Sequence, residues 1–178
     1  MNIAVLKADG NGYFFRPDST LNHAWYDYYC PDGVSALTAV PCVYTKIIKA
    51  GKCVSERFAP RYFNSFAFGC LLSDANPAVP EPVACTMDFT SVMDMDMAPL
   101  ADLPESRFVL ELNGKDVFAT ETPLNAKMFI DALTQITRLT TLRIGDVIAI
   151  ELEPGVAVRQ GDSLTLRYAG SAHSIKIL

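Results

Sequence analysis

The sequence lacks long hydrophobic runs and has no excess of basic residues. No apolar segment approaches the ~18 residues that a membrane-spanning helix needs. Asp9 and Gly10 interrupt the first apolar stretch too early for a signal peptide. Lys and Arg total 15 against 20 Asp and Glu, and the resulting net charge of −5 does not favour nucleic-acid binding. We therefore expect a cytoplasmic protein that binds neither nucleic acid nor a membrane.

Histidine is scarce and the cysteines are scattered. The two histidines are His23 and His173, and the five cysteines lie at positions 30, 42, 53, 70 and 85, without a Cys-x-x-Cys pair. A structural zinc site needs clustered thiolates or imidazoles, so zinc is not expected. The odd number of cysteines favours free, mostly buried thiols. The sequence also contains no Gly-x-Ser-x-Gly, which disfavours a serine hydrolase.

The chain does contain enough apolar residues for one sizeable core. Of its 178 residues, 50% are hydrophobic and 20% are charged. A chain of this composition buries enough surface to offset the entropy lost on folding, which excludes disorder as its main state. Its length is that of one typical domain or slightly more. We expect a single domain over residues 1–178.

Alternation of apolar residues indicates β-structure over most of the chain. Short runs rich in aromatic and branched residues predict strands at residues 2–7, 13–16, 25–29, 43–49 and 107–112. Asn113-Gly114 suits the positive φ angles of a type I′ turn, which predicts a hairpin between residues 107–112 and 115–122. Five prolines between residues 76 and 106 predict irregular connections there.

Two segments have helical character. Apolar residues recur at roughly helical spacing from Met128 to Leu139, and Asn125 before them is a suitable N-cap. They predict one main helix over about 125–139. A short helix is predicted over about 55–64, with Ser55 as its cap, although Pro60 limits its length. Many strands with two helices and no regular strand–helix alternation indicate a β-rich α+β fold.

A Gly-Asp pair precedes two similar strands in the last third of the chain. Gly145-Asp146 leads into the apolar run 147–152, and Gly161-Asp162 leads into 163–168. Each pair is typical of a turn that starts a strand. One repetition is too few for a repeat protein, so we expect the same turn to be used twice within a sheet.

Several of these segments, taken in order, resemble the fumarylacetoacetate hydrolase family. Residues 108–166 share its succession of strand, Asn-Gly turn, strand, helix and Gly-Asp turns, and Thr141-Leu142-Arg143-Ile144-Gly145-Asp146 is similar to its first such turn. Phe14-Phe15-Arg16-Pro17-Asp18-Ser19 resembles its Phe-x-Lys-Pro-x-Ser motif, with Arg in place of Lys. Residues 49–62 are similar to some members as well. The resemblance covers most of the chain from Phe14 onward.

The resemblance implies a fold of rolled, mixed β-sheets with few helices, assembled as a homodimer. Members of the family cleave or rearrange carbon–carbon bonds in small oxo or diketo acids. They use Mg²⁺ or Ca²⁺ to hold paired substrate oxygens and to stabilise the enolate that develops. Pairing of this chain with an active relative is a further arrangement that the resemblance suggests.

The resemblance also implies that the catalytic groups are missing. The family's Glu-x-Glu metal ligands correspond to Val40 and Cys42, its third carboxylate to Leu71, and a lysine of its site to Cys85. Two apolar side chains and a thiol are poor ligands for a hard cation, so no metal cofactor is expected. The family's segment with Arg-Asn-Tyr and His after the first strand has no counterpart between Lys7 and Gly12, which shortens the N-terminal part.

Some residues remain candidates for a rewired site. Glu151 and Glu153 stand where the family has Thr-Gly-Thr-Pro, and their spacing on a strand places both on one face. They suggest a relocated cation site, with Asp74 as a further ligand, or a solvated strand end. Arg16 suits a carboxylate ligand, because its planar guanidinium matches that geometry, or it has a structural role.

Two sulfur-based alternatives are weaker. Met93, Met95 and Met97 alternate with Asp94 and Asp96, a spacing that suggests a Cu(I) site or simply a strand with one apolar face. Cys42 is either a nucleophile in the former metal pocket or a small core residue with a raised pKa.

The sequence therefore predicts a degenerate member of this family that has lost its metal-dependent catalysis and acts in small-acid binding or subunit pairing. The first alternative is an active hydrolase, isomerase or decarboxylase on a small oxo or diketo acid, using rewired residues such as Arg16, Glu151 and Glu153. The second is a structural protein-interaction module. A surviving concave pocket without metal would favour ligand binding, whereas a filled pocket with a large apolar surface patch would favour the interaction module.

Overall fold

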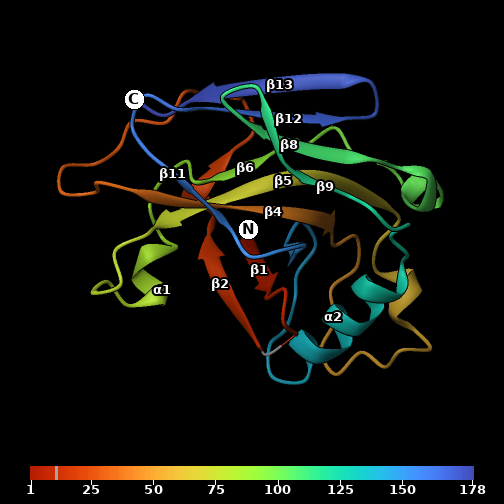
Figure 1. Cartoon of the computed structure of the whole chain (residues 1–178). Coiled ribbons are helices and arrows are strands. Elements are labelled where there is room, and N and C mark those ends of the chain that lie inside the picture. Colours follow the sequence, from red (N-terminus) through yellow and green to blue (C-terminus); the bar gives the residue numbers. More distant parts are fainter. Residues whose placement is uncertain (11) are drawn as a thin grey trace.

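The described residues form two β-sheets with few helices (Figure 1). The structure is a computed structural model and describes residues 1–10 and 12–178. The larger sheet contains β1 (Asn2–Leu6), β2 (Tyr13–Pro17), β3 (Leu21–Asn22), β4 (Leu37–Lys46), β5 (Ser65–Asp74), β6 (Ser91–Met93), β7 (Ala98–Pro99), β10 (Val147–Glu151) and β11 (Val156–Val158). The smaller sheet contains β8 (Phe108–Leu112), β9 (Lys115–Ala119), β12 (Ser163–Tyr168) and β13 (Ser171–Lys176). The predicted β-rich α+β class is confirmed.

The larger sheet is mixed and curls into a half-barrel. Its order is β2-β1-β10-β4-β5-β6-β3, with β11 added to β4 and β7 to β5. The pairs β1–β10 and β3–β6 are parallel, and the other pairs are antiparallel. β4 and β5 lie at its centre, and most of their side chains are buried on both faces. Such central strands need a nearly continuous apolar sequence, which residues 37–45 and 66–72 provide.

The predicted strands agree with the structure except in the loop after β3. The strand predicted at 43–49 is the second half of β4, which begins at Leu37 and ends at Lys46. The strand predicted at 25–29 is wrong, because only Tyr28 forms an isolated bridge, to Ile177. Trp25 has a φ of 57°, and a left-handed residue ends the extended conformation that a strand requires.

Glycine turns set the strand connections in the second half of the chain. Asn113 and Gly114 have φ angles of 53° and 75°, as a type I′ turn requires, and the predicted hairpin of β8 and β9 is confirmed. The two Gly-Asp turns also share one hydrogen-bond pattern. Asp146 accepts the backbone N–H of Arg143 at 2.8 Å, and Asp162 accepts that of Arg159 at 2.8 Å. The sequence repetition is thus a repeated turn.

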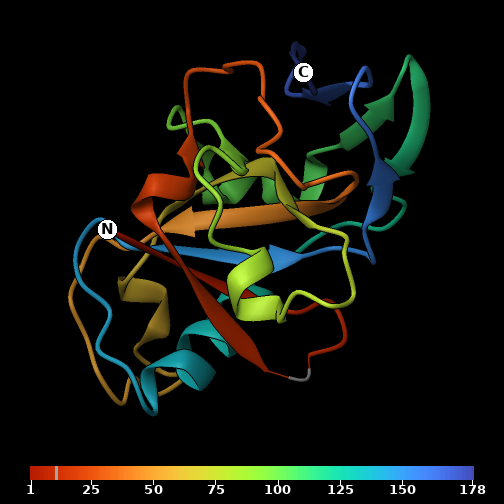
Figure 2. The same cartoon turned by 90° about the vertical axis from the view of Figure 1, so that its left-hand side faces the viewer.

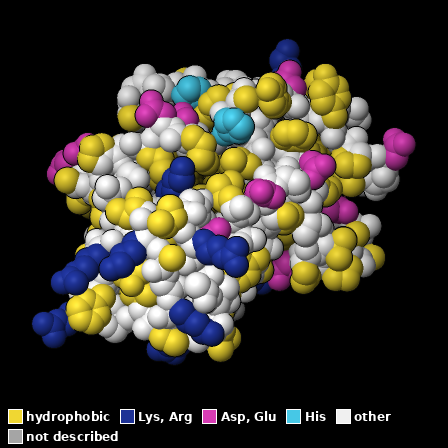
Figure 3. Space-filling view, turned by 180° about the vertical axis from the view of Figure 1, so that it is seen from behind, with side chains coloured by type: hydrophobic (Ala, Val, Ile, Leu, Met, Phe, Trp, Pro, Cys, Tyr) yellow, Lys and Arg dark blue, Asp and Glu magenta, His cyan; other side chains and the backbone are white. Residues whose placement is uncertain are grey.

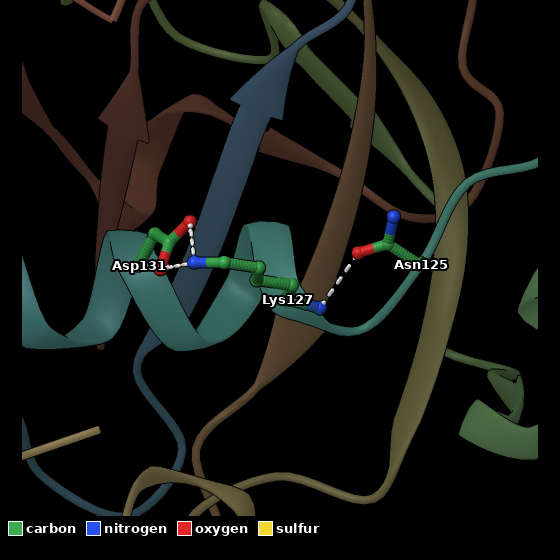
Figure 4. A network of polar contacts seen from close by, with 3 residues as sticks. All are labelled: Asn125, Lys127 and Asp131. Atoms are coloured by element: carbon green, nitrogen blue, oxygen red, sulfur yellow. Dashed lines mark hydrogen bonds and ion pairs between the residues drawn. The ribbon is translucent and has the colours of Figure 1, made fainter.

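The main predicted helix is present as α2 (Lys127–Thr137), which is shorter than the predicted 125–139. Asn125 accepts the backbone N–H of Lys127 through its side-chain oxygen at 3.0 Å, which satisfies a free donor of the first turn (Figure 4). Lys127 also forms an ion pair with Asp131 one turn later, at 2.6 Å (Figure 4). The buried side of α2 includes Phe129, Leu133 and Ile136.

The short helix predicted at 55–64 is present only as a 3₁₀ helix of three residues. This segment contains turns and the 3₁₀ helix η2 (Ala59–Arg61), because Pro60 cannot donate the hydrogen bond that would continue an α-helix. A four-residue helix, α1 (Glu81–Ala84), instead lies in the proline-rich connection. Two further 3₁₀ turns are η1 (Asp18–Thr20) and η3 (Leu100–Glu105).

One apolar core joins the two sheets and α2. Figure 2 shows the arrangement of these elements from the side. The Phe68 ring of β5 stacks on the Phe108 ring of β8, with centroids 4.9 Å apart. Phe129 of α2 packs against Phe63 on the other side of the core, at 5.7 Å. Among the described residues, no helix has both the length and the apolar character to cross a bilayer.

Candidate functional site

A second group of buried side chains lies on the other face of the half-barrel. Cross-strand partners share a face of a sheet, and the register of β4, β5, β10 and β1 puts these side chains together. We call this group the inner-face cluster; its members are Ile3, Val5, Cys42, Tyr44, Ala67, Leu71, Met93, Val147 and Ala149. The candidate residues named from the sequence lie in it or around it.

The structure brings three of the four former-pocket positions together. Val40 of β4 lies directly opposite Leu71 of β5, and Cys42, two residues along β4, lies opposite Gly69. Cys42 is 0% exposed and Leu71 2%, and Val40 packs against the cluster as a partly buried residue. Cys85 directly follows α1 as its C-cap and is also buried. The place is therefore filled with apolar atoms and thiols.

Burial determines the chemistry of these thiols. It raises the pKa of Cys42 well above its ordinary value, because a thiolate there would lose its hydration. Burial likewise raises the pKa of Cys85, although the nearby Arg16 opposes that shift. A thiol that stays protonated is neither a good nucleophile nor a good metal ligand.

A divalent cation does not fit these residues. Within residues 1–10 and 12–178, no three His, Cys, Asp or Glu side chains are placed to hold a metal ion. Mg²⁺ and Ca²⁺ require oxygen ligands, which Val40, Cys42 and Leu71 do not supply. The methionines of the suggested Cu(I) site instead pack on the inner-face cluster, Met93 within it and Met95 and Met97 at its edge.

Arg16 is buried in β2 and binds the protein itself. Its Nη2 donates to the backbone oxygen of Leu72 at 2.5 Å and to Oγ1 of Thr90 at 2.7 Å. The side chain is 1% exposed, and burial lowers its pKa. Its Nε has no hydrogen-bond partner, and no described carboxylate forms an ion pair with it. Arg16 thus ties β2 to β5 and to the loop before β6.

The two glutamates of the suggested relocated site differ in their surroundings. Glu151 is the last residue of β10, partly buried, and accepts the backbone N–H of Ala8 at 3.3 Å. Burial raises its pKa, and the hydrogen bond from Ala8 opposes that shift. Glu153 lies beyond the strand, is exposed, and lines a cavity of about 190 Å³ beside β9. Asp74 uses its carboxylate to accept the backbone N–H of Asn76.

A polar cluster that the sequence did not predict lies beside a cavity of about 240 Å³. The Tyr168 hydroxyl donates to Oδ2 of Asp94 at 3.2 Å, and Nε2 of His173 lies 4.0 Å from the same oxygen. The His173 ring stacks on Trp25 with centroids 4.3 Å apart. Trp25 follows β3, Asp94 follows β6, and Tyr168 and His173 belong to the hairpin of β12 and β13, so no local sequence signal joins all of them. No hydroxyl among the described residues is hydrogen-bonded to His173, so the cluster is not a nucleophilic triad.

Basic side chains gather around the segment between β4 and β5 (Figure 3). A hollow of about 290 Å³ there is lined by Lys49, Lys52 and Arg61, and no carboxylate lines it. The Lys49 ammonium lies 5.4 Å from the centre of the Tyr62 ring, and Arg61 lies 5.2 Å from that of Phe58. In the described part of the chain, these three cations form no ion pair with a carboxylate. This surface attracts anions although the whole chain is acidic.

Comparison with solved structures identifies the fold. A protein from Yersinia pestis CO92 assigned to the fumarylacetoacetate hydrolase family superposes with a TM-score of 0.81 at 16% identity, over 99% of this chain and 92% of that one. The chain has the fumarylacetoacetate hydrolase fold. The resemblance predicted from the sequence is confirmed at the level of the fold. No protein-family model matches the sequence, and no curated protein matches it either.

Enzymes with this fold are among the other similar structures. Fumarylpyruvate hydrolase from Pseudomonas aeruginosa, in complex with Mn²⁺ and pyruvate, has a TM-score of 0.80 at 14% identity, over 100% of this chain and 89% of that one. The 2-hydroxyhepta-2,4-diene-1,7-dioate isomerase from Mycobacterium marinum has a TM-score of 0.83 at 14% identity, over 99% and 74% of the two chains. At these identities the fumarylacetoacetate hydrolase fold is shared, and activity is a separate question.

Proposed function

We propose that this chain is a divergent member of the fumarylacetoacetate hydrolase family that acts by binding rather than by metal-dependent catalysis. The observation that carries the proposal is the inner-face cluster. Val40, Cys42 and Leu71 meet on one buried face, where a catalytic metal would require oxygen ligands. Two carbon side chains and a protonated thiol supply no oxygen ligand for such a metal at these positions.

Five cavities of the described residues lie away from these positions. None of the five is lined by Val40, Cys42, Leu71, Cys85 or Arg16. An active enzyme with rewired residues has less support, because Arg16 is engaged by Leu72 and Thr90 and because β10 ends at Glu151, before Glu153. The geometry supports a packed scaffold best.

Manganese binding tests the proposal directly. We expect Mn²⁺ at millimolar concentration to leave the melting temperature of the wild-type protein unchanged and to give no heat of binding in calorimetry. A ligand at 100 times its Kd stabilises a folded protein by about 2.7 kcal/mol, so a real site would be seen. Metal-dependent turnover of an acylpyruvate or of oxaloacetate by the purified protein would overturn the proposal.

A gain-of-ligand variant provides the matched control. The triple variant Val40→Glu, Cys42→Glu, Leu71→Asp puts three carboxylates on the face that the structure assigns to these positions. We expect this variant to be less stable than wild type without metal, because it buries like charges. Mn²⁺ should restore part of its melting temperature. A variant that folds but does not respond to Mn²⁺ would show that the three positions are not equivalent to the metal site.

We call the hollow at the segment that connects β4 to β5 the basic hollow. It favours a second function, the binding of a small carboxylic acid. Lys49, Lys52 and Arg61 line it without a neutralising carboxylate, so an anionic ligand would supply the missing charge. This location differs from Arg16, which the sequence analysis named as a carboxylate ligand and which is buried and hydrogen-bonded to Leu72 and Thr90. The carboxylic acid would then bind at the surface of the protein.

Titration with oxalate and pyruvate distinguishes binding at this hollow from binding at Arg16. We expect the double variant Lys49→Gln, Arg61→Gln to weaken binding about fivefold to tenfold, since each exposed charge pair contributes up to about 1 kcal/mol. Lys115→Gln combined with Arg159→Gln removes the same charge elsewhere and should leave binding unchanged. Loss of binding in Arg16→Lys alone would place the ligand at Arg16 instead.

Subunit pairing is the remaining part of the proposed binding role. The family resemblance suggests a homodimer or a complex with an active relative. Sedimentation velocity of the purified chain tests the homodimer, which should sediment at twice the monomer mass over a range of concentrations. Co-expression with a metal-binding family member tests the mixed complex.

A further inference from the structure

The largest cavity among those described lies away from both sites above. Its volume is about 660 Å³, within the range typical of small-molecule sites. Its lining comes from two short segments, residues 26–29 with Pro31 and residues 87–89. The first follows β3 and is drawn in orange at the top of Figure 2, and the second precedes β6. We call this cavity the aromatic hollow.

Backbone hydrogen bonds hold both segments in place. The backbone N–H of Tyr28 donates to the oxygen of Lys176 at 2.8 Å, and that of Cys30 donates to the oxygen of Leu178 at 2.9 Å. The Asn22 side chain receives the N–H of Tyr26 and donates to its oxygen. On the other side, the N–H of Phe89 donates to the oxygen of Ser19 at 3.1 Å. The hollow is therefore a built feature and not the gap beside an unsupported loop.

Three aromatic rings face outward at this hollow. Tyr26, Tyr29 and Phe89 are 60%, 73% and 48% exposed, values that are unusual for large aromatic side chains of a folded protein. The Tyr26 and Phe89 rings meet edge to face, with centroids 6.2 Å apart. Tyr28 and Met87 form the floor, where the tyrosine hydroxyl points at the methionine sulfur at 3.6 Å.

The backbone is strained where it presents these rings. Trp25, which precedes Tyr26, and Phe89 itself have φ angles of 57° and 58°, a region that bulky residues rarely adopt. The Trp25 ring is held by stacking on His173, which stabilises the first of these turns. Strained residues of this kind are concentrated at ligand sites, because surrounding contacts must maintain them.

The charge at the aromatic hollow is negative. Asp27 and Asp88 line it, both exposed, and no lysine or arginine lines it. Among the described residues, neither carboxylate forms an ion pair. Aromatic faces attract cations, and carboxylates reinforce that attraction while repelling anions. A methylated ammonium group suits such a site better than Na⁺ or K⁺, because it gives up little hydration and its methyl groups fill space against the rings.

We propose that the aromatic hollow binds an organic cation of the methylated ammonium class. Tyr26, Tyr29 and Phe89 contact its methyl groups, and Asp27 and Asp88 balance its charge. The site is independent of the inner-face cluster and of the basic hollow, so its test does not depend on the proposed loss of catalysis.

Calorimetric titration with choline chloride tests this proposal, and the uncharged dimethylbutanol isostere of choline is the key control. Cation–aromatic attraction is worth about 0.5–2 kcal/mol, so we expect choline to bind about threefold to thirtyfold more tightly than the isostere. A trimethyllysine peptide carries the same group, and comparing it with choline shows whether the natural source is a free metabolite or a modified protein. Equal affinities for choline and its isostere, or no binding at about 10 mM choline, would overturn the proposal.

Two variants and two matched controls locate the binding site. Tyr29→Ala and Asp88→Asn should each weaken choline binding about threefold or more, and both change exposed side chains, so folding should be retained. Leu139→Ala and Asp102→Asn change exposed residues elsewhere and should have no effect on choline binding. Sedimentation of the same proteins tests the competing occupant, a second copy of the chain. A dimer that Tyr29→Ala dissociates would identify the hollow as a subunit interface and would contradict the ligand proposal.

Discussion

Cys42 shows how a single buried position decides what the inner-face cluster can do. Its side chain is fully buried, and burial holds its pKa well above the ordinary range, so the thiol stays neutral at physiological pH. Cys70, on the opposite face of the neighbouring strand, is in the same state, with its pKa raised to about 12. Cys53 is exposed, and Cys30 is intermediate.

Alkylation of the native protein should follow this order of exposure. With iodoacetamide near neutral pH, we expect Cys53 to react first and Cys30 more slowly, because burial raises the pKa of Cys30. Cys42, Cys70 and Cys85 should react only when the protein unfolds. Mass spectrometry of the digested protein measures each site. Labelling of Cys42 as fast as that of Cys53 would revive the nucleophile hypothesis.

Glu151 is a second residue whose environment opposes its charge. Its folded-state pKa is raised by burial above the ordinary value of 4.5. Below that value the carboxyl is neutral in both states, and as pH rises toward the folded-state pKa the unfolded state ionises first, so stability is lost. We therefore expect Glu151→Gln to gain stability relative to wild type as pH rises from about 4 to 7.

Urea unfolding at a series of pH values measures this difference. Glutamine retains an oxygen that accepts the N–H of Ala8, so the variant tests charge rather than the hydrogen bond. Glu153→Gln is the control, because it removes a carboxylate that is exposed beyond the strand end. A difference in the free energy of unfolding between Glu151→Gln and wild type that stays constant with pH would contradict a raised pKa of Glu151.

At the scale of elements, the two Gly-Asp turns allow a comparison within one chain. Asp146 is 2% exposed, and it joins β1 to β10 by accepting the N–H groups of Asn2 and Arg143, each at 2.8 Å. Asp162 forms the corresponding turn nearer the surface and accepts from Asn113 and Arg159. Hydrogen bonds to a charged group contribute about 1.5–3 kcal/mol, and a buried donor that loses its acceptor adds to the loss.

We expect Asp146→Ala to lower the free energy of unfolding by about 3 kcal/mol or more, and Asp162→Ala by a smaller amount, because water replaces the lost acceptor there. Chemical denaturation of both variants provides the comparison. Asp146→Asn keeps one acceptor and should lie between wild type and Asp146→Ala. Equal losses in the two alanine variants would show that burial does not distinguish the turns.

Local signals predicted these turns, whereas tertiary contacts decided the elements that sequence reasoning missed. Asn113-Gly114 and the Gly-Asp pairs are fixed by backbone conformations that few residues adopt, so their sequence is informative by itself. The segment 25–29 has strand-like composition, but it has no neighbouring strand beyond the bridge at Tyr28 and bends at Trp25. Residue spacing could not show this, because pairing depends on the whole fold.

The candidate functional site likewise has parts that the sequence predicted and parts that it could not predict. The juxtaposition of Val40, Cys42 and Leu71 came from the family resemblance and follows from the register of β4 and β5. The pairing of Glu151 with Glu153 assumed that the strand continues, but β10 ends at Glu151. The cluster of Asp94, Tyr168 and His173 joins the residue after β6 to the hairpin of β12 and β13, and no local pattern connects these two segments.

At the scale of the whole molecule, one core connects two sheets that share no strand. Phe68 of the larger sheet stacks on Phe108 of the smaller sheet, and the main core includes residues of β4, β5, β8, β12, β13 and α2. Trp25, the single tryptophan of the chain, stacks on His173 of β13. Its fluorescence therefore reports on the smaller sheet, whereas far-ultraviolet circular dichroism reports on the β-structure of both sheets.

We expect the two signals to give one coincident unfolding transition in denaturant, because neither sheet can bury its apolar face without the other. Phe108→Ala removes the stacked ring at the junction and should lower the free energy of unfolding by about 3–5 kcal/mol, with both signals shifting equally. Phe58→Ala, at an exposed phenylalanine, should shift neither signal appreciably. A fluorescence transition that moves alone in Phe108→Ala would mean that the smaller sheet unfolds as a separate unit, and the single domain predicted over residues 1–178 would then be two.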